Sequence, residues 1–351
     1  MCLNDLLQRA DDLRASDLHL VPGHPPMVRV HTMIEPMEAP VLRNEDVLQC
    51  FESMATDAQR ARFEEHGDMD FSHEVSGLGR YRVNAHRQRG VIALALRMVR
   101  SEVPELSSLN LPSTVANLTR LPRGLVLVTG DTGSGKSTTL AAMISAMNRR
   151  ARLHVITLED PIEYRLESEK CLIEQRELGQ DMASFSSGLK HALRQDPDII
   201  LVGEMRDLET TALAMSAAET GHLVLSTLHT VNASQTVERI IDMYPAGQQN
   251  QIRAMLGNTL QAVVSQTLFR RIDQEGMIPA VELLLCTPAV RNIIRESRTF
   301  EIPNVIETSR SVGMISLDAS ITELCRRGCI SQDDSLARAV STGYVSLQLA
   351  A

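Results

Sequence analysis

The 351-residue sequence predicts an α/β protein built as two domains. Its length fits about two domains of roughly 100 to 200 residues each. From about residue 113 onward, short apolar runs alternate with helix-forming runs, which indicates a parallel sheet covered by helices on both faces. The first 100 residues mix a helical start with short alternating segments and predict a smaller α+β domain.

The expected boundaries follow the change between these two patterns. An N-terminal domain is predicted at 1–100, a linker at 101–112, where prolines interrupt the chain, and the second domain at 113–351. The elements predicted for the second domain are strand 125–129, helix 136–148, strand 153–158, a helix around 185–193, strand 199–202, helix 207–220, strand 223–228 and a helical tail from Pro245 that includes an apolar stripe over 252–268.

Composition excludes several classes of protein. No run of about 18 apolar residues is present, so no membrane span is expected, and the N-terminus has no signal segment, so a cytoplasmic location follows. The net charge of −9 disfavours broad contact with nucleic acid. The six cysteines are scattered, so neither a structural zinc nor a disulfide framework is expected.

The strongest motif is GDTGSGKS at 130–137, between the first of these strands and the first helix. Glycines let backbone N–H groups turn inward around phosphates, Lys136 supplies a positive charge to the β- and γ-phosphates, and the hydroxyl of Ser137 suits Mg²⁺. The sequence therefore predicts a nucleoside triphosphate site rather than an ordinary glycine-rich turn. Its predicted nucleotide-binding residues are Gly130, Thr132, Gly133, Ser134, Gly135, Lys136, Ser137 and Thr138.

Ligands gather at the carboxyl ends of parallel strands, and two predicted strands end in acidic residues. After 153–158 comes EDPIE, ending at Glu163, which could accept a proton from an attacking water; a surface acidic turn is the alternative. After 199–202 comes Glu204, which could hold Mg²⁺ through a bound water; a carboxylate favoured by a helix N-terminus is the alternative.

Two histidines flank strand 223–228. His229 lies at the expected phosphate edge and could contact the γ-phosphate, whereas His222 should lie at the opposite end, where packing or a subunit contact is as good an explanation. Either side chain could also be a satisfied polar group of the strand.

Six arginines crowd a stretch of the N-terminal domain that has no acidic residue and no lysine. They could stabilise charge on a phosphoryl group from a neighbouring subunit, contact nucleic acid, or line a solvated strand face. These residues are Arg80, Arg82, Arg87, Arg89, Arg97 and Arg100.

Four segments together resemble the signature boxes of the type II/type IV secretion ATPase superfamily: GDTGSGKS, ITLEDPIEY, DPDIILVGEMRD and TGHLVLSTLHT. The resemblance covers nearly the whole chain. Within the superfamily, the segment AVRNIIRE at 289–296 is similar to the AIRNLIRE helix of type IV pilus retraction ATPases, the PilT-like proteins. The long extra N-terminal domain and tetracysteine zinc site of the extension and type II secretion relatives are missing.

This resemblance implies an N-terminal PAS-like domain and a RecA-like P-loop NTPase core, assembled as a homo-hexamer with ATP and Mg²⁺ between subunits. By matching position it makes Glu163 the catalytic glutamate, Glu204 the magnesium-associated glutamate, Arg82 and Arg97 arginine fingers, and His222 and His229 the paired histidine-box residues. It also implies an inner-membrane pilus platform protein as partner, at the cytoplasmic face of the inner membrane.

Three functions stay open on the sequence. The favoured one is an ATP-hydrolysing motor for pilus retraction and twitching motility. The second is a related pilus-assembly, type IVB or type II secretion ATPase. The third is a nucleotide-gated scaffold with little turnover, or a nucleic-acid translocase on the same core.

Overall fold

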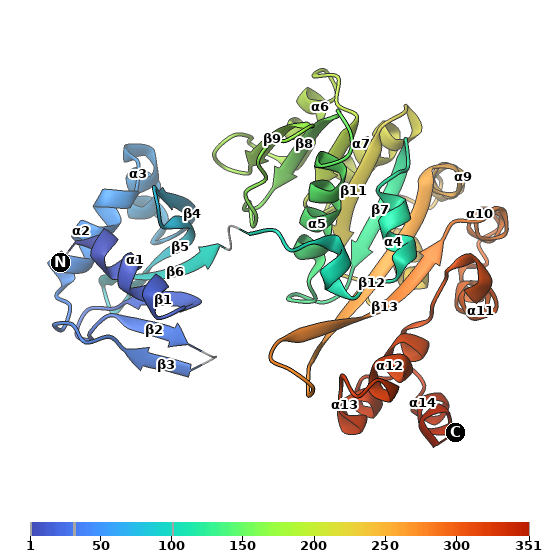
Figure 1. Cartoon of the computed structure of the whole chain (residues 1–351). Coiled ribbons are helices and arrows are strands. Elements are labelled where there is room, and N and C mark those ends of the chain that lie inside the picture. Colours follow the sequence, from blue (N-terminus) through green and yellow to red (C-terminus); the bar gives the residue numbers. More distant parts are fainter. Residues whose placement is uncertain (1, 31–32, 100–101, 351) are drawn as a thin grey trace. The chain divides into compact units, whose positions relative to one another are not determined.

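The computed structural model describes residues 2–30, 33–99 and 102–350 (Figure 1). The chain forms two compact units, Met1–Glu102 and Val103–Ala351. The elements of the first unit are α1 (Leu3–Asp12), β1 (Asp17–Leu20), β2 (Met27–Val30), β3 (Met33–Pro36), α2 (Asn44–Met54), α3 (Asp57–His66), β4 (Asp68–Val75), β5 (Gly79–Gln88) and β6 (Val91–Val99).

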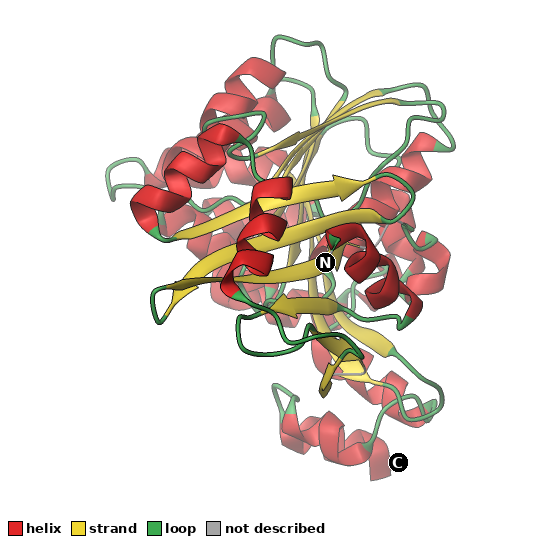
Figure 2. Cartoon of the chain, turned by 90° about the vertical axis from the view of Figure 1, so that its left-hand side faces the viewer, coloured by secondary structure: helices red, strands yellow, loops and turns green. Residues whose placement is uncertain are grey.

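The first unit is an antiparallel sheet with helices on one face. Its strands lie in the order β3-β2-β1-β6-β5-β4. Buried leucines of α1 and the phenylalanines of α2 and α3 share one core with the sheet, and Figure 2 shows these helices in front of the strands. Local signals delimit the elements: α3 begins at a capping box of Thr56 and Gln59 and ends at Gly67, whose φ is 79°. The unit has the α+β make-up predicted for this part of the chain.

The second unit contains a larger sheet of mixed direction. Its elements are η1 (Leu106–Leu109), α4 (Ser113–Leu118), β7 (Gly124–Thr129), α5 (Lys136–Asn148), β8 (His154–Glu159), β9 (Leu172–Glu177), α6 (Phe185–Ala192), β10 (Ile199–Val202), α7 (Leu208–Glu219), β11 (Leu223–Leu228), α8 (Ala233–Asp242), α9 (Gln249–Thr259), β12 (Leu260–Arg270), β13 (Met277–Leu285), α10 (Pro288–Arg295), η2 (Thr299–Glu301), α11 (Ile302–Thr308), η3 (Arg310–Val312), α12 (Leu317–Arg326), α13 (Gln332–Ala337) and α14 (Thr342–Ala350).

The sheet order is β13-β12-β7-β11-β10-β8-β9. Every neighbouring pair is parallel except β12 and β13, which form an antiparallel hairpin at one edge. Helices cover both faces of this sheet, and each face has its own hydrophobic core. On one face α4, α5 and η1 pack on the strands, and on the other α6 to α11 do so. All six residues of β7 are buried, as expected for a central strand between two helical layers.

The elements predicted between 125 and 228 are confirmed to within a residue or two, including α5 at 136–148. Within the segment predicted as a linker, Leu106 is buried and Leu109 packs beside it in the core under α5. Both therefore belong to the second unit.

The tail from Pro245 was predicted to be helical, and this was wrong for two segments, which form strands β12 and β13. The apolar stripe over 252–268 continues from α9 into β12, whose residues are nearly all buried on both faces. A short apolar run fits a buried strand as well as a helix, and here the strand completes the parallel sheet beside β7. Strand β9 was not predicted, because its sequence LIEQRE is too polar to show the pattern of a buried strand.

Candidate functional site

The phosphate loop lies between β7 and α5, and its shape depends on glycine. Gly130, Gly133 and Gly135 have φ values of 136°, 79° and 89°, in the region that side chains disfavour. A Cβ at Gly130 would lie 2.3 Å from the carbonyl oxygen of Gln266 on β12 and 2.7 Å from Oγ of Ser134. Gly130 is therefore required for the close packing of the loop against β12 as well as for the turn.

Lys136 is the first residue of α5, and its amine points into the loop. Nζ donates to the carbonyl oxygens of Gly130, at 2.8 Å, and of Asp131, at 2.9 Å. Burial lowers the pKa of Lys136, while the charges of Glu204, Asp131 and Glu163 act to raise it. The structure thus brings both predicted catalytic glutamates into the electrostatic environment of the phosphate-loop lysine.

Glu204 follows β10 and meets His229, which follows β11. Oε2 of Glu204 lies 3.4 Å from Nε2 of His229 and 2.7 Å from Nε of Arg206. Because Leu228 pairs with Thr129 across the parallel sheet, His229 begins its loop beside Gly130. The carboxyl ends of the three neighbouring strands β7, β11 and β10 therefore lie together, and His229 and Glu204 are at this edge of the sheet.

Glu163 lies on the loop after β8, next to a glutamate that the sequence analysis did not single out. Burial raises the pKa of Glu159, against hydrogen bonds from Thr157, Gln175 and the backbone of Glu163. The following residue, Tyr164, has its hydroxyl 2.9 Å from Oγ1 of Thr138 on α5. This loop is thereby tied directly to the helix of the phosphate loop.

The remaining predicted nucleotide-binding residues follow from the same loop. Ser134 is buried, Thr132 and Gly133 are exposed at its tip, and Ser137 and Thr138 are half-buried in the first turn of α5. Ser137 and Glu204 offer the hard oxygen ligands that Mg²⁺ prefers. In the described part of the chain, no group of three or more His, Cys, Asp or Glu residues could hold a metal ion.

His222 does not join this group. It lies before β11, at the end of the strand opposite His229, and its carbonyl oxygen accepts from the N–H of Gly124. Its Nδ1 lies 3.0 Å from the carbonyl oxygen of Ala217. The predicted pair of histidines is therefore separated by the length of the strand, about 20 Å for six residues, and the assignment of His222 to the catalytic group finds no support in this geometry.

The two predicted arginine fingers lie side by side on the first unit. Arg82 on β5 is directly opposite Arg97 on β6, which is in turn opposite Asp17 on β1. Nε of Arg97 is 2.9 Å from Oδ1 of Asp17, and Nε of Arg82 is 3.9 Å from Oδ1 of Asp70. Both arginines lie on the face of the sheet that the helices leave uncovered. Arg100, also in the predicted cluster, lies outside the described residues.

Residues 289–295 of the segment AVRNIIRE lie in helix α10, and Glu296 is its C-cap. Arg291 donates to the carbonyl oxygens of Gly257, Asn258 and Cys286. These bonds satisfy the C-terminal end of α9 and fix α10 against it. Asn292, by contrast, is exposed.

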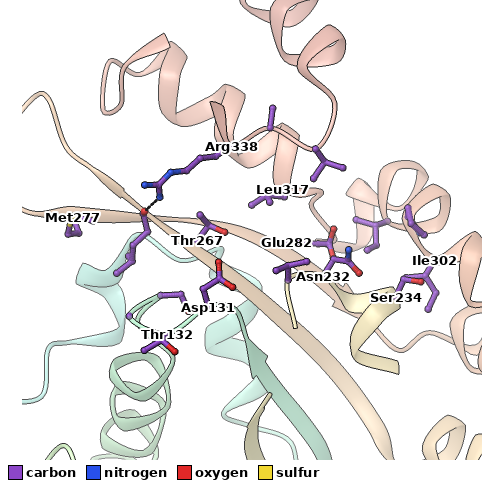
Figure 3. Close-up of a pocket in the computed structure, with 18 residues that line it drawn as sticks. Asp131, Thr132, Asn232, Ser234, Thr267, Met277, Glu282, Ile302, Leu317 and Arg338 are labelled. Carbon is purple, nitrogen blue, oxygen red and sulfur yellow. Dashed lines mark hydrogen bonds between the residues drawn. The ribbon is translucent and has the colours of Figure 1, made fainter. Parts of the chain in front are cut away.

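A cavity of about 660 Å³ borders the tip of the phosphate loop (Figure 3). Asp131 lies on its floor, Glu282 on β13 on one side, and Arg338 on the other, where Nη1 donates to the carbonyl oxygen of Leu268 at 2.6 Å. Oε1 of Glu282 accepts from the N–H of Ala233 and so anchors the start of α8. The lining does not include Lys136, Glu163, Glu204 or His229.

The family model described as "Type II/IV secretion system protein" matches residues 2–282, which is well over half of the chain. The chain belongs to this family, as the four motifs predicted. No helix among the residues described has the length and apolar character needed to cross a bilayer.

Individual relatives narrow the likeness. The chain is 45% identical to the "Type IV pilus retractation ATPase PilT" of Pseudomonas aeruginosa, over 97% of this chain and 98% of that protein. A crystal structure of the pilus retraction motor PilT with bound ADP superposes with a TM-score of 0.92 at 40% identity, over 97% of this chain and 98% of that one. The Legionella pneumophila ATPase DotB gives a TM-score of 0.84 at 28% identity, over 95% and 93%. The predicted likeness to pilus retraction ATPases is thereby confirmed.

Proposed function

We propose that this protein is a Mg²⁺-dependent ATPase that works as a homo-hexameric motor for type IV pilus retraction. The single observation that supports hydrolysis best is that the Glu204–His229 pair lies at the carboxyl ends of β10 and β11, beside the phosphate loop that holds Lys136, whose amine also feels the charge of Glu163. A phosphate loop alone binds nucleotide. Carboxylates beside it supply what phosphoanhydride cleavage also needs, a proton acceptor and a ligand shell for the metal.

The residues divide the work as follows. Backbone N–H groups of 132–137 and the N-terminus of α5 bind the phosphates, and Lys136 neutralises the β- and γ-oxygens. The hydroxyl of Ser137 and, through water, Glu204 would hold Mg²⁺, which would supply positive charge to the phosphate oxygens. Glu163 accepts the proton of the attacking water. His229, linked to Glu204, contacts the γ-phosphate and distinguishes the triphosphate from the product.

Arg82 and Arg97 complete the site from a neighbouring copy. Their exposed guanidinium groups suit a phosphate that develops charge during transfer. The first unit, proposed to be a PAS-like domain, would then move against the second unit, proposed to be RecA-like, as nucleotide is consumed. His222 is left to packing or to a contact between copies.

The proposed setting follows the relatives. The PilT of Pseudomonas aeruginosa is named as a pilus retractation ATPase, and we extend that role to this chain with an inner-membrane platform protein as the recipient of force. The ring would act at the cytoplasmic face of the inner membrane without a span of its own, and nucleic acid is not an expected partner.

The test of the chemistry is Glu163→Gln, with Glu174→Gln as the matched control on the partly exposed side of β9. Glu163→Gln should retain ATP binding and lower kcat by about 1000-fold, and Glu174→Gln should leave kcat unchanged. Turnover that survives Glu163→Gln would remove the assignment of the base. A purified chain that stays monomeric with Mg²⁺ and ATP, by mass photometry, would remove the ring.

A related secretion motor is the second candidate, because the fold likeness to the ATPase DotB extends over nearly the whole chain. The two candidates share their chemistry and differ in phenotype. A deletion strain with excess pili and no surface motility supports retraction. A strain with unchanged pili and failed secretion supports the secretion motor. A strain without pili would instead support a role in pilus assembly.

A further inference from the structure

The loop that carries Glu163 is fastened by side chains of the neighbouring strand β9. In the parallel pairing of β8 with β9, Thr157 lies opposite Gln175 and Glu159 opposite Glu177. Gln175 and Glu177 are two residues apart, so their side chains leave the strand on the same face. That face is the one beneath loop 160–166.

The amide of Gln175 bridges the beginning and the end of this loop. Its Nε2 donates to Oε1 of Glu159 at 3.0 Å and to the carbonyl oxygen of Tyr164 at 2.8 Å. Its Oε1 accepts from the N–H of Leu166 at 2.7 Å. Both hydrogens of the amide nitrogen and the amide oxygen are thus in use, which no other side chain of this size can reproduce.

The middle of the loop is held by carboxylates. Oε2 of Glu177 accepts from the N–H of Ile162 at 3.0 Å, and Glu159 accepts from the N–H of Glu163 itself. Glu177 is buried and Oε1 is bonded to the amide of Gln180 at 2.9 Å. Hydrogen bonds from β9 or from Glu159 therefore reach the backbone at 162, 163, 164 and 166, on both sides of the Glu163 side chain.

We propose that Gln175 is a positioning residue for Glu163: through Glu159, Tyr164 and Leu166 it fixes the loop so that the carboxylate of Glu163 meets the attacking water in one orientation. This inference rests on the proposed function, in which Glu163 is the base. Gln175 itself touches neither the phosphate loop nor any predicted nucleotide-binding residue among its hydrogen-bond partners. Its effect should therefore fall on the chemical step and leave nucleotide binding intact.

The test uses the full chain carrying Gln175→Leu, compared with Glu174→Gln on the same strand. Gln175→Leu should lower kcat by about 10- to 100-fold, as expected when a base is misplaced by about 1 Å, with an unchanged KM for ATP. In a Glu163→Gln background the same change should cause no further loss of the residual rate, because its route of action has been removed. Glu174→Gln should have neither effect.

Hydrogen exchange gives a readout that does not depend on hydrolysis. In Gln175→Leu, the amides of 162–166 should exchange faster while those of 132–137 keep their protection. If Gln175→Leu prevents folding, Gln175→Glu replaces it, because its carboxylate can still accept from the N–H of Leu166 while both donors to Glu159 and Tyr164 are lost.

The outcomes separate this inference from the proposed function. Unchanged kcat and unchanged exchange in a folded Gln175 variant would overturn the positioning role even where Glu163→Gln abolishes turnover. A raised KM with unchanged kcat would overturn it as well. Faster exchange at 162–166 together with full turnover in Glu163→Gln would instead sustain the fastening of the loop and overturn the assignment of Glu163 as base.

Discussion

Nε2 of His229 lies 3.4 Å from Oε2 of Glu204, so the ends of β10 and β11 are joined beside the phosphate loop. The side chain of Glu204 is mostly buried, and that of His229 is 44% exposed. The proposed contact of His229 with the γ-phosphate would therefore be linked to Glu204, the glutamate proposed for the metal shell, through a single contact.

Replacing His229 tests this link. His229→Phe removes the contact with Glu204 and the donor proposed for the γ-phosphate, so kcat should fall by about 100-fold while ADP still binds. Steady-state kinetics and ADP titration measure the two effects. His191→Phe, at an exposed position of α6, serves as the control, and an equal loss there would argue against a specific role for His229.

The tyrosine hydroxyls offer a matched pair for stability. Tyr164→Phe removes the hydrogen bond to Thr138 and should lower the free energy of unfolding by about 0.5 to 1.5 kcal/mol. Tyr244 has a buried hydroxyl for which the described residues provide no hydrogen-bond partner, and burial raises its pKa to about 12. Tyr244→Phe should therefore leave stability unchanged or raise it. Urea titrations measure the free energy of unfolding of both variants. A larger loss of stability in Tyr244→Phe than in Tyr164→Phe would contradict the prediction.

Gly130→Ala should destabilise the second unit more than Gly133→Ala. At Gly130 a Cβ meets the backbone oxygen of Gln266 at 2.3 Å, whereas at Gly133 no atom lies within 4 Å and only the positive φ opposes a side chain. Backbone strain alone costs about 1 to 2 kcal/mol, so Gly133→Ala should lower the free energy of unfolding by about that much. Gly130→Ala should lower it further and abolish ATP binding. Thermal unfolding and nucleotide binding of the two variants are compared. Equal losses of stability would show that β12 moves aside at little cost to admit the Cβ at Gly130.

Lowering the pH should reduce the stability of the first unit, because Asp17 becomes protonated. Burial acts to raise the pKa of Asp17, but hydrogen bonds from Ser16 and Arg97 and the charge of Arg97 outweigh it and lower the pKa below 3.8. A carboxyl with a lowered folded pKa contributes stability above its unfolded pKa and loses that contribution as the pH falls through the folded value.

Arg97→Ala should consequently lower the free energy of unfolding by about 1 kcal/mol near neutral pH, a small value because the arginine is largely exposed. Below about pH 4 the free energy of unfolding of the variant should fall less steeply than that of the wild type, because the pKa of Asp17 returns toward its unfolded value. Arg82→Ala, which breaks only a long contact between two exposed side chains, is the control. A steeper acid limb in Arg97→Ala would contradict this account.

Local signals carried most of what the sequence predicted. The phosphate loop and the strand ends at Glu204 and His229 were recognisable because each follows a short apolar run, and parallel topology then requires them to meet. Strand β12 was misread because a buried apolar run has no period that separates strand from helix. Its identity depends on the pairing of Ser265 with Thr129, which is far away in the chain.

Contacts between distant segments could not be read from the sequence at all. Gln175 lies in a strand too polar to be recognised, and its role appears only when β9 is placed beside β8. The partnership of Arg97 with Asp17 likewise depends on the register of β1 with β6. Such contacts follow from tertiary pairing, for which a single sequence contains no local mark.

The ion pair of Arg97 and Asp17 has a consequence for any anion that the first unit meets. Only Nε of Arg97 is bonded to the buried carboxylate, and 70% of the side chain remains exposed. A guanidinium held at one nitrogen keeps its planar fork aimed in one direction, so less rotational freedom is lost when its terminal nitrogens engage a phosphate. The entropic penalty of ordering this side chain is met when the sheet folds, long before a ligand arrives.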